Sequence, residues 1–201
     1  MTAIDEHETG ELWVFGYGSL MWRPGFEALE RVPARLKGLH RALCVYSYVH
    51  RGTPERPGLV LGLDLGGMCR GIAYRVAAKA RAQTIAYLRA REQVTSVYRE
   101  TVRRIDLEDA ERRQVDALVY VVDRGHVQYA GRLSLAERLH HVRQGHGRSG
   151  PNREYVLDAV RALEALGYRE TDMHLLAERL GKSETEIRPQ QSDGQLGAAE
   201  P

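Results

Sequence analysis

The chain has 201 residues, of which 43% are hydrophobic and 28% charged, a balance typical of one globular domain. Its 29 Lys and Arg against 27 Asp and Glu give a formal net charge of +2, which excludes the strong positive field that nucleic acids or anionic membranes call for. The two cysteines, Cys44 and Cys69, lack the spacing of a zinc site or a disulfide framework, which favours buried free thiols. The acidic opening MTAIDEHETGELW, and the lack of any apolar run approaching ~18 residues, lead us to expect a cytoplasmic protein without a membrane span.

Two polar segments flank the part of the chain that can fold. Residues 1–11 are polar, and residues 182–201 are rich in Ser, Glu, Gln, Gly and Pro. Neither segment has enough apolar side chains to offset the entropy lost on ordering. We therefore predict disordered tails at 1–11 and 182–201, and one folded domain over 12–181.

The first half of the domain has the pattern of short β-strands. Six runs of β-branched and aromatic residues are separated by turn residues, at 13–16, 42–49, 59–65, 69–76, 101–105 and 117–122. Only one helical pattern, over 78–93, interrupts them, so the regular alternation of strand and helix in a doubly wound parallel sheet is missing. The pattern predicts a mixed or antiparallel sheet that can close into a small barrel.

The last third of the domain is predicted to be helical. Ser134 and Glu137 have the spacing of a capping box at the start of a first helix. Asn152 is expected to cap a second helix that stops at Gly167, and Thr171 a short third helix. The predicted fold class is therefore α+β, a small mixed or antiparallel β-barrel with flanking helices.

A glycine-rich turn follows the first strand in the segment WVFGYGSLMW, residues 13–22. Gly16 and Gly18 can adopt backbone conformations that are closed to other residues. Such a turn can direct successive N–H groups at one point, where they bind a carboxylate or a developing oxyanion. The alternative is a tight turn between core aromatic side chains with no ligand.

Better-known glycine motifs do not match this turn. A dinucleotide fingerprint would need a glycine at Met21, a nucleophile elbow would need glycines at Tyr17 and Met21, and a phosphate loop would need Gly-Lys-Ser/Thr. Ser19 as a nucleophile would need a base and an orienting acid from elsewhere in the chain. We therefore expect no nucleotide cofactor.

Glu92 falls on the apolar stripe of the predicted helix over 78–93. It follows Ile85 and Leu88 at helical spacing, so its carboxylate is expected to face the core. Desolvation and the negative end of the helix dipole both raise the pKa of such a carboxyl group, which suits a general base near neutral pH. The alternative is a structural ion pair with Arg89 or Arg91.

The histidines do not have the spacing of a metal site. His140 and His141 are adjacent and therefore point to different sides of a helix, and His146 follows in a Gly-rich loop. We predict no metal.

Five ordered segments make the sequence resemble the ChaC-type glutathione-specific γ-glutamylcyclotransferases. They are WVFGYGSLMW, HRGTPERPGLVLGL from His50, GIAYRV from Gly71, YLRAREQ from Tyr87 and GRSGPNREYV from Gly147. The match runs from about Trp13 to Leu180.

The resemblance implies a compact barrel, no cofactor, and glutathione as substrate, cyclised to 5-oxoproline with release of Cys-Gly. It implies that the turn binds the γ-glutamyl group and that Glu92 transfers the proton. By the same resemblance, Tyr98 and Tyr155 are further candidates for substrate contact. The turn residues are Val14, Phe15, Gly16, Tyr17, Gly18, Ser19 and Leu20.

Three other functions stay open at this point. The chain can be a cyclotransferase for a different γ-glutamyl amine, or a non-catalytic γ-glutamyl-binding module of the same fold. An arginine-rich nucleic-acid binder would need a strongly basic face. The oligomeric state is not predicted.

Overall fold

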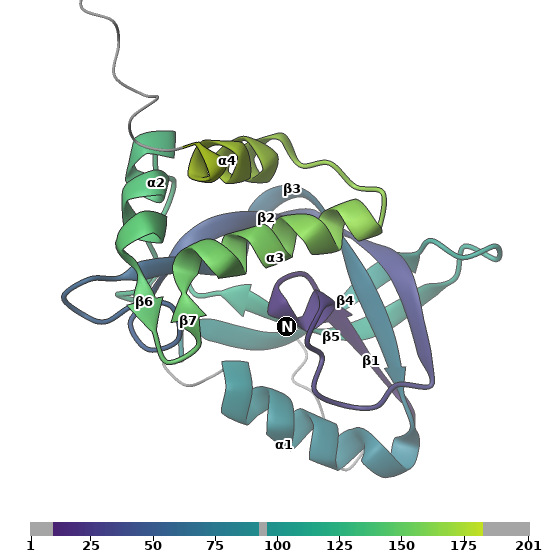
Figure 1. Cartoon of the computed structure of the whole chain (residues 1–201). Coiled ribbons are helices and arrows are strands. Elements are labelled where there is room, and N and C mark those ends of the chain that lie inside the picture. The colour runs from purple at the N-terminus through teal and green to yellow at the C-terminus, as the bar shows by residue number, and fades with distance from the viewer. Residues whose placement is uncertain (1–9, 93–95, 183–201) are drawn as a thin grey trace, which may run out of the picture.

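A five-stranded barrel forms the centre of the computed structural model, which describes residues 10–92 and 96–182 (Figure 1). The strands are β1 (Leu12–Gly16), β2 (Glu30–Ser47), β3 (Gly58–Val76), β4 (Tyr98–Leu107) and β5 (Gln114–Val122). They close in the order β1-β3-β2-β4-β5, with only the β1–β5 pair parallel among these strands. The predicted α+β barrel is confirmed. The two predicted tails fall almost entirely on residues 1–9 and 183–201, outside the described residues.

The long hairpin of β2 and β3 differs from the prediction. The runs 59–65 and 69–76 belong to one strand, because Gly66 and Gly67, with φ of 93° and 69°, form a bulge through which pairing continues. On the partner strand, Gly38 (φ 84°) lies within the register shift between Lys37 and Leu39. The prediction of two separate strands was therefore wrong.

Strand β2 begins at Glu30 rather than Ala42. Its first half alternates buried Val32, Ala34 and Leu36 with more exposed charged residues and Pro33. These interruptions hide the strand from a search for apolar runs, although the period of two is present.

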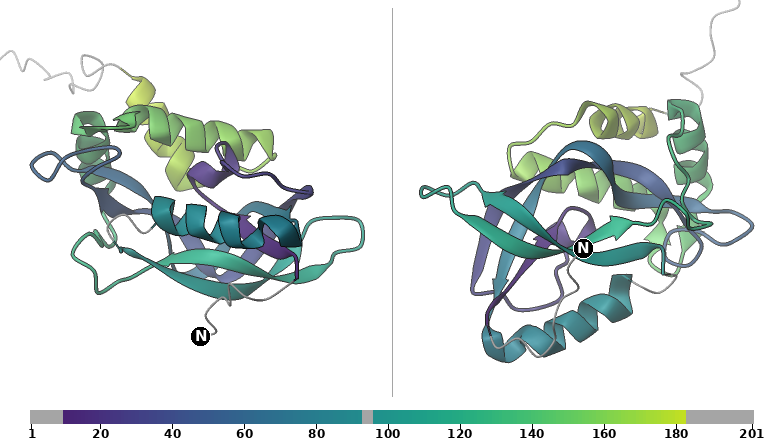
Figure 2. Two further views of the ribbon diagram at one scale, coloured as in Figure 1. Left: turned by 90° about the horizontal axis from the view of Figure 1, so that it is seen from below. Right: turned by 180° about the vertical axis from the view of Figure 1, so that it is seen from behind.

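Helices cover opposite sides of the barrel. A 3-10 turn η2 (Ala78–Ala80) leads into α1 (Arg81–Glu92), which lies across the barrel from α3 (Asn152–Ala165) and α4 (Thr171–Gly181) (Figures 1 and 2). The predicted helix extended to Gln93, which lies outside the described residues. Helix α2 (Leu135–Gln144) and a two-stranded hairpin, β6 (His146–Gly147) and β7 (Gly150–Pro151), complete the fold. No helix of the described residues is long and apolar enough to span a membrane.

The helix ends confirm some of the predicted caps and correct others. The capping box of Ser134 and Glu137 is present, and Gly167 ends α3 with φ 72°. Helix α3 has Pro151 at its N-cap, and α4 has Glu170 at its N-cap with no side-chain cap hydrogen bond. The predictions that Asn152 and Thr171 are caps were therefore wrong.

Asn152 instead holds the barrel to α3. Its side chain is fully buried, accepts a hydrogen bond of 2.7 Å from the Leu59 N–H, and donates one of 2.7 Å to the Leu59 carbonyl. An amide is the side chain that can satisfy both backbone groups at one position. This use of Asn152 cannot be read from local spacing, because Leu59 is 93 residues away.

We expect Asn152→Leu to lower the free energy of unfolding by about 2–3 kcal/mol, because two buried backbone groups of Leu59 lose their partners. Denaturation with urea measures the change. Arg153→Gln, one residue further along α3 and outside this contact, is the control. A loss below about 0.5 kcal/mol for Asn152→Leu would contradict the role.

Candidate active site

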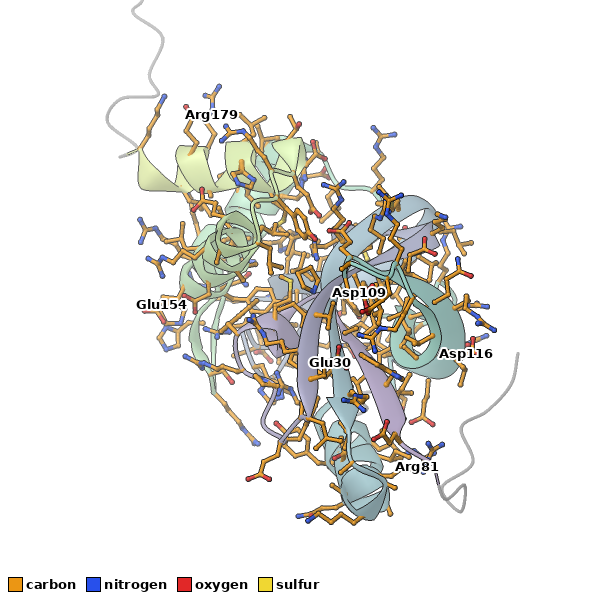
Figure 3. The ribbon with its side chains drawn as sticks, turned by 90° about the vertical axis from the view of Figure 1, so that its right-hand side faces the viewer. Glu30, Arg81, Asp109, Asp116, Glu154 and Arg179 are labelled. Atoms are coloured by element: carbon orange, nitrogen blue, oxygen red, sulfur yellow. The ribbon has the colours of Figure 1, made fainter. Side chains whose placement is uncertain are left out.

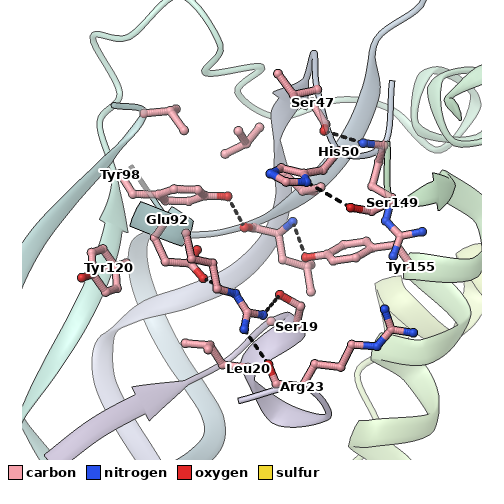
Figure 4. A pocket seen from close by; sticks show the side chains of 18 of the residues that line it. Ser19, Leu20, Arg23, Ser47, His50, Glu92, Tyr98, Tyr120, Ser149 and Tyr155 are labelled. Carbon is pink, nitrogen blue, oxygen red and sulfur yellow. Dashed lines mark hydrogen bonds and ion pairs between the residues drawn. The ribbon is translucent and has the colours of Figure 1, made fainter. Parts of the chain in front are cut away.

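A cavity of about 390 Å³ opens where the turn after β1, the end of β2, the last turn of α1 and the first turns of α3 meet. Its size falls in the range of small-molecule sites. Seven tyrosines line it, among them Tyr98 and Tyr120 on the neighbouring strands β4 and β5 and Tyr155 on α3 (Figure 4). The lining residues used below are Tyr17, Gly18, Ser19, Leu20, Arg23, His50, Arg51, Leu61, Arg91, Glu92, Tyr98, Tyr120, Ser149 and Tyr155.

The predicted turn divides between the cavity and the core. Residues Tyr17, Gly18, Ser19 and Leu20 line the cavity. Val14, Phe15 and Gly16 form the end of β1 and are not among the lining residues. These three residues form the base of the turn. Their position does not support the prediction that they contact a ligand directly.

Of the two glycines of the turn, Gly16 is the one that the surrounding space requires. Neither Gly16 nor Gly18 has a positive φ, so the predicted need for a conformation closed to other residues was wrong for φ. A Cβ at Gly16 would lie 2.9 Å from Leu20 Cβ and 3.2 Å from the Tyr74 ring. At Gly18 it would lie 3.4 Å from Tyr155 Oη. A side chain at position 16 would therefore collide with Leu20 and Tyr74, so the turn can pack in this way only with glycine there.

Three long-range hydrogen bonds hold the turn in place. Arg41 Nε donates to the Tyr17 carbonyl at 2.6 Å, and Tyr74 Oη donates to the Leu20 carbonyl at 2.7 Å. Tyr17 Oη in turn donates to the Tyr120 carbonyl at 2.9 Å. Because carbonyl oxygens of the turn are used on the protein side, the turn is fixed in one orientation.

The amides of the turn keep hydrogen-bonding capacity. A short 3-10 helix, η1 (Ser19–Met21), begins here, and the Met21 N–H donates to the Gly18 carbonyl. No hydrogen bond between described residues is donated by the N–H of Gly18, Ser19 or Leu20. Amides at the start of a helical turn are suited to a carboxylate or an oxyanion.

Glu92 is the last residue of α1 and lines the same cavity. Ile85 and Leu88 on its stripe are fully buried, as the periodicity predicts, and the Glu92 side chain is 18% exposed. Burial raises the pKa of the Glu92 carboxyl group, and the charge of Arg91 opposes that rise only in part. The carboxylate is thus desolvated but reachable from the cavity.

Arg91 connects the carboxylate to the glycine turn. Its Nε lies 3.2 Å from Glu92 Oε1, and its Nη2 donates to Ser19 Oγ at 2.8 Å. Its Nη1 donates to the Arg23 carbonyl at 2.6 Å and to Tyr87 Oη at 2.9 Å. The ion pair that the sequence offered as the alternative role of Glu92 is therefore present, with Arg91 as the partner. Both residues of this pair line the cavity. Ser19 Oγ accepts a hydrogen bond from a guanidinium, which cannot remove the hydroxyl proton as a general base would.

We expect turnover to fall as the pH drops through the raised pKa of Glu92, because only the ionised form accepts a proton. Arg91→Gln removes the charge that lowers this pKa, so the acidic limb of the kcat/KM profile should move to higher pH. The pH profile of the variant measures the shift. Arg91→Lys keeps a charge and serves as the control, and an unchanged acidic limb in Arg91→Gln would refute the coupling.

Tyr98 and Tyr155, predicted through the resemblance, also line the cavity. Tyr98 Oη donates to the Leu61 carbonyl at 2.7 Å, and Tyr155 Oη accepts from the Leu61 N–H at 3.1 Å (Figure 4). One residue of β3 thus fixes both rings on the cavity wall. The cavity thus brings together Tyr17 of the turn after β1, Glu92 of α1, Tyr98 of β4 and Tyr155 of α3.

Arg89, considered from the sequence as a partner of Glu92, pairs with Glu100 instead, and the basic residues of the cavity wall were missed. Arg89 forms a two-point ion pair with Glu100, at 2.9 and 2.8 Å, and Tyr120 Oη donates to the same carboxylate. Arg23, His50 and Arg51 line the cavity but were not proposed. The segment HRG at His50 was quoted only as part of the resemblance, and an arginine in a loop gives no local signal of burial.

No group of three or more His, Cys, Asp or Glu suited to a metal occurs in the described part of the chain. His141 contacts the Pro57 carbonyl at 3.2 Å and packs on Tyr46. Both cysteines are buried and free, as predicted.

Comparison with known proteins gives a consistent family. The sequence model described as ChaC-like protein matches residues 12–182. The chain is 34% identical to the Escherichia coli (strain K12) glutathione-specific γ-glutamylcyclotransferase, over 83% of this chain and 71% of that protein. It is 32% identical to the human glutathione-specific γ-glutamylcyclotransferase 1, over 83% of this chain and 76% of that protein.

A solved structure supports the same fold. The crystal structure of the yeast γ-glutamylcyclotransferase specific to glutathione superposes with a TM-score of 0.79 at 22% identity, covering 86% of this chain and 96% of the other. The family match spans the barrel, the glycine turn and the helix that carries Glu92. The chain therefore belongs to the ChaC-like protein family.

Proposed function

We propose that this protein is a glutathione-specific γ-glutamylcyclotransferase, which converts reduced glutathione into 5-oxoproline and Cys-Gly. The observation that carries the proposal is one cavity in which the Glu92 carboxylate, with its raised pKa, lies with a turn whose amides are free to bind an anion. The names of the E. coli and human relatives support the choice of substrate.

The reaction is an internal aminolysis. Glu92 accepts a proton from the α-ammonium group of the substrate, and the freed amine attacks the γ-carbonyl carbon to close a five-membered ring. The carbonyl oxygen becomes an oxyanion, for which the amides of Gly18, Ser19 and Leu20 are suitable donors. The Glu92 carboxyl group then returns the proton to the cysteinyl nitrogen as the C–N bond breaks. The ring nitrogen loses its second proton, so that 5-oxoproline is released as a neutral lactam and the amine of Cys-Gly becomes protonated.

The protein's part in this scheme is mainly one of geometry. The nucleophile and the electrophile belong to the same molecule, so holding the γ-glutamyl chain in a folded shape supplies much of the acceleration. The rings of Tyr17, Tyr98 and Tyr155 are held by backbone hydrogen bonds and can restrict the shapes that the substrate adopts.

Purified protein incubated with reduced glutathione, and separately with γ-glutamylalanine, tests the proposal through the formation of 5-oxoproline. We expect product from glutathione and little from γ-glutamylalanine. Product only from γ-glutamylalanine would reassign the enzyme to another γ-glutamyl amine. No product from either would favour a binding module. A cytoplasmic location stays a prediction from the sequence.

A further inference from the structure

The cavity has a second end that the proposed chemistry does not use. Figure 4 shows Glu92, Tyr98 and Tyr120 on one side of the cavity, and His50, Ser149 and Tyr155 on the other. We call the part lined by Arg23, His50, Arg51 and Ser149 the distal end. It is built by the loop after β2, the residues after η1 and the turn between β6 and β7.

Arg51 is the central group of the distal end. It is only 6% exposed, and its guanidinium lies 5.5 Å from the centre of the Tyr155 ring. Its Nη1 donates to the Pro151 carbonyl at 3.0 Å, and it forms no ion pair with a described carboxylate. A buried guanidinium with five N–H donors and one protein acceptor is costly unless an anion joins it.

A second arginine, which is exposed, adds positive charge to the cavity wall. The Arg23 side chain lines the same cavity and makes no hydrogen bond or ion pair with any residue that the structure describes. Burial chiefly, and also the charge of Arg23, lower the pKa of Arg51, whereas Tyr155 and the carboxylates of Glu154 and Asp158 act in the opposite direction. Neither carboxylate lines the cavity or forms an ion pair with Arg51, so the two arginines of the cavity wall favour an anionic ligand.

His50 does not supply this charge. Burial, together with the charge of Arg51, lowers the pKa of His50, and its Nδ1 lies 3.0 Å from Ser149 Oγ. A neutral imidazole held by a hydroxyl shapes the wall, so the positive charge of the distal end belongs to Arg23 and Arg51.

The ligand's own geometry identifies which anion fits. In a γ-glutamyl tripeptide the α-carboxylate is bonded to the carbon that carries the α-ammonium group, so it must stay near Glu92. The terminal carboxylate is separated from the reacting carbonyl by two residues, which span at most about 7 Å when extended. The terminal carboxylate is therefore the carboxylate of the substrate that can extend farther from Glu92.

We propose that Arg51, assisted by Arg23, binds the C-terminal carboxylate of the leaving dipeptide, and that this contact makes the enzyme selective for γ-glutamyl peptides that end in a free carboxylate. The inference rests on the proposed function and adds specificity-determining residues to it.

The test compares kcat/KM for glutathione with that for its C-terminal glycine amide. For the unmodified enzyme we expect glutathione to be favoured about 10- to 100-fold, the range of a charged hydrogen-bonded contact. Arg51→Gln should reduce kcat/KM for glutathione by a similar factor and change that for the amide little. Arg23→Gln should act in the same direction with a smaller effect.

The matched control is Arg104→Gln on the outer face of the barrel. Arg104 pairs with the exposed Asp116 of β5, which projects from the barrel surface in Figure 3. The Arg104→Gln variant should keep the same preference for glutathione over its amide.

Equal losses for both substrates in Arg51→Gln would overturn the proposal, because binding of the α-carboxylate or a purely structural role predicts that result. If Arg51→Gln does not fold, two other variants decide the question through the same ratio of kcat/KM for glutathione to kcat/KM for its amide. They are Arg23→Gln and Arg51→Lys, of which the second keeps the charge but cannot donate two parallel hydrogen bonds to a carboxylate as arginine can. An unchanged ratio in both also overturns it.

Calorimetric titration with Cys-Gly and with its amide separates this inference from the proposed function. Tighter binding of Cys-Gly, weakened by Arg51→Gln, would support the site even if the protein did not turn over glutathione. Equal binding of the two dipeptides would refute it even if turnover were normal.

Discussion

Glu92→Gln is expected to reduce the turnover of glutathione by about 10²- to 10⁴-fold, the usual contribution of a positioned proton-transfer group. The amide has the size of the carboxylate but cannot accept the proton of the α-ammonium group. The fold should persist, because Arg91 keeps its hydrogen bonds to Ser19, the Arg23 carbonyl and Tyr87. The rate of 5-oxoproline formation and the thermal unfolding curve measure the two effects.

The matched control is Glu178→Gln on α4. Glu178 has a side chain that is 58% exposed and pairs with Lys182 on the surface, so its loss should leave turnover unchanged. Near-normal turnover in Glu92→Gln would end the proposal that this carboxylate is the general base. A large loss of thermal stability in that variant would show instead that Glu92 acts mainly through folding.

Arg41→Met is expected to lower the free energy of unfolding by about 3–5 kcal/mol, as happens when one partner of a buried ion pair is removed. The Arg41 side chain is fully buried, pairs with Glu170, and donates to the carbonyls of Tyr17 and Arg70. The substitution leaves the Glu170 carboxylate without its partner and the Tyr17 carbonyl without its donor. Urea denaturation at neutral pH measures the loss.

The pH dependence of that loss identifies its cause. Burial raises the pKa of Glu170, and Arg41 opposes the rise, so removal of Arg41 should raise this pKa further. The unpaired charge is costly while Glu170 is ionised and harmless once it is protonated. The deficit of Arg41→Met should therefore shrink as the pH falls through the raised pKa.

A double variant completes this experiment. Arg41→Met with Glu170→Gln should recover part of the lost stability, because the uncompensated carboxylate is gone. A deficit of Arg41→Met below about 1 kcal/mol, or one that does not change with pH, would contradict the role of the pair. Since Arg41 also holds the turn through Tyr17, the variant's kinetics report whether turn position matters for turnover.

The sequence by itself determined the features that depend on neighbouring residues. The period of the helix placed Glu92 on the stripe of Ile85 and Leu88, and the spacing of Ser134 and Glu137 identified a capping box. The order of strands and helices and the family resemblance followed from the same local patterns. These are contacts within a few residues, which the spacing of side-chain types encodes directly.

The tertiary structure alone decided which distant residues meet. Two predicted strands are one continuous strand through Gly66 and Gly67. The Asn152 side chain binds Leu59 of β3 and does not cap a helix. The fold also brought Arg51 and Arg23 into the cavity of Glu92. These outcomes depend on closure of the barrel, which brings together segments that are far apart in the chain. The periodicity of a segment shows which of its faces is buried, but it does not show which other segment covers that face.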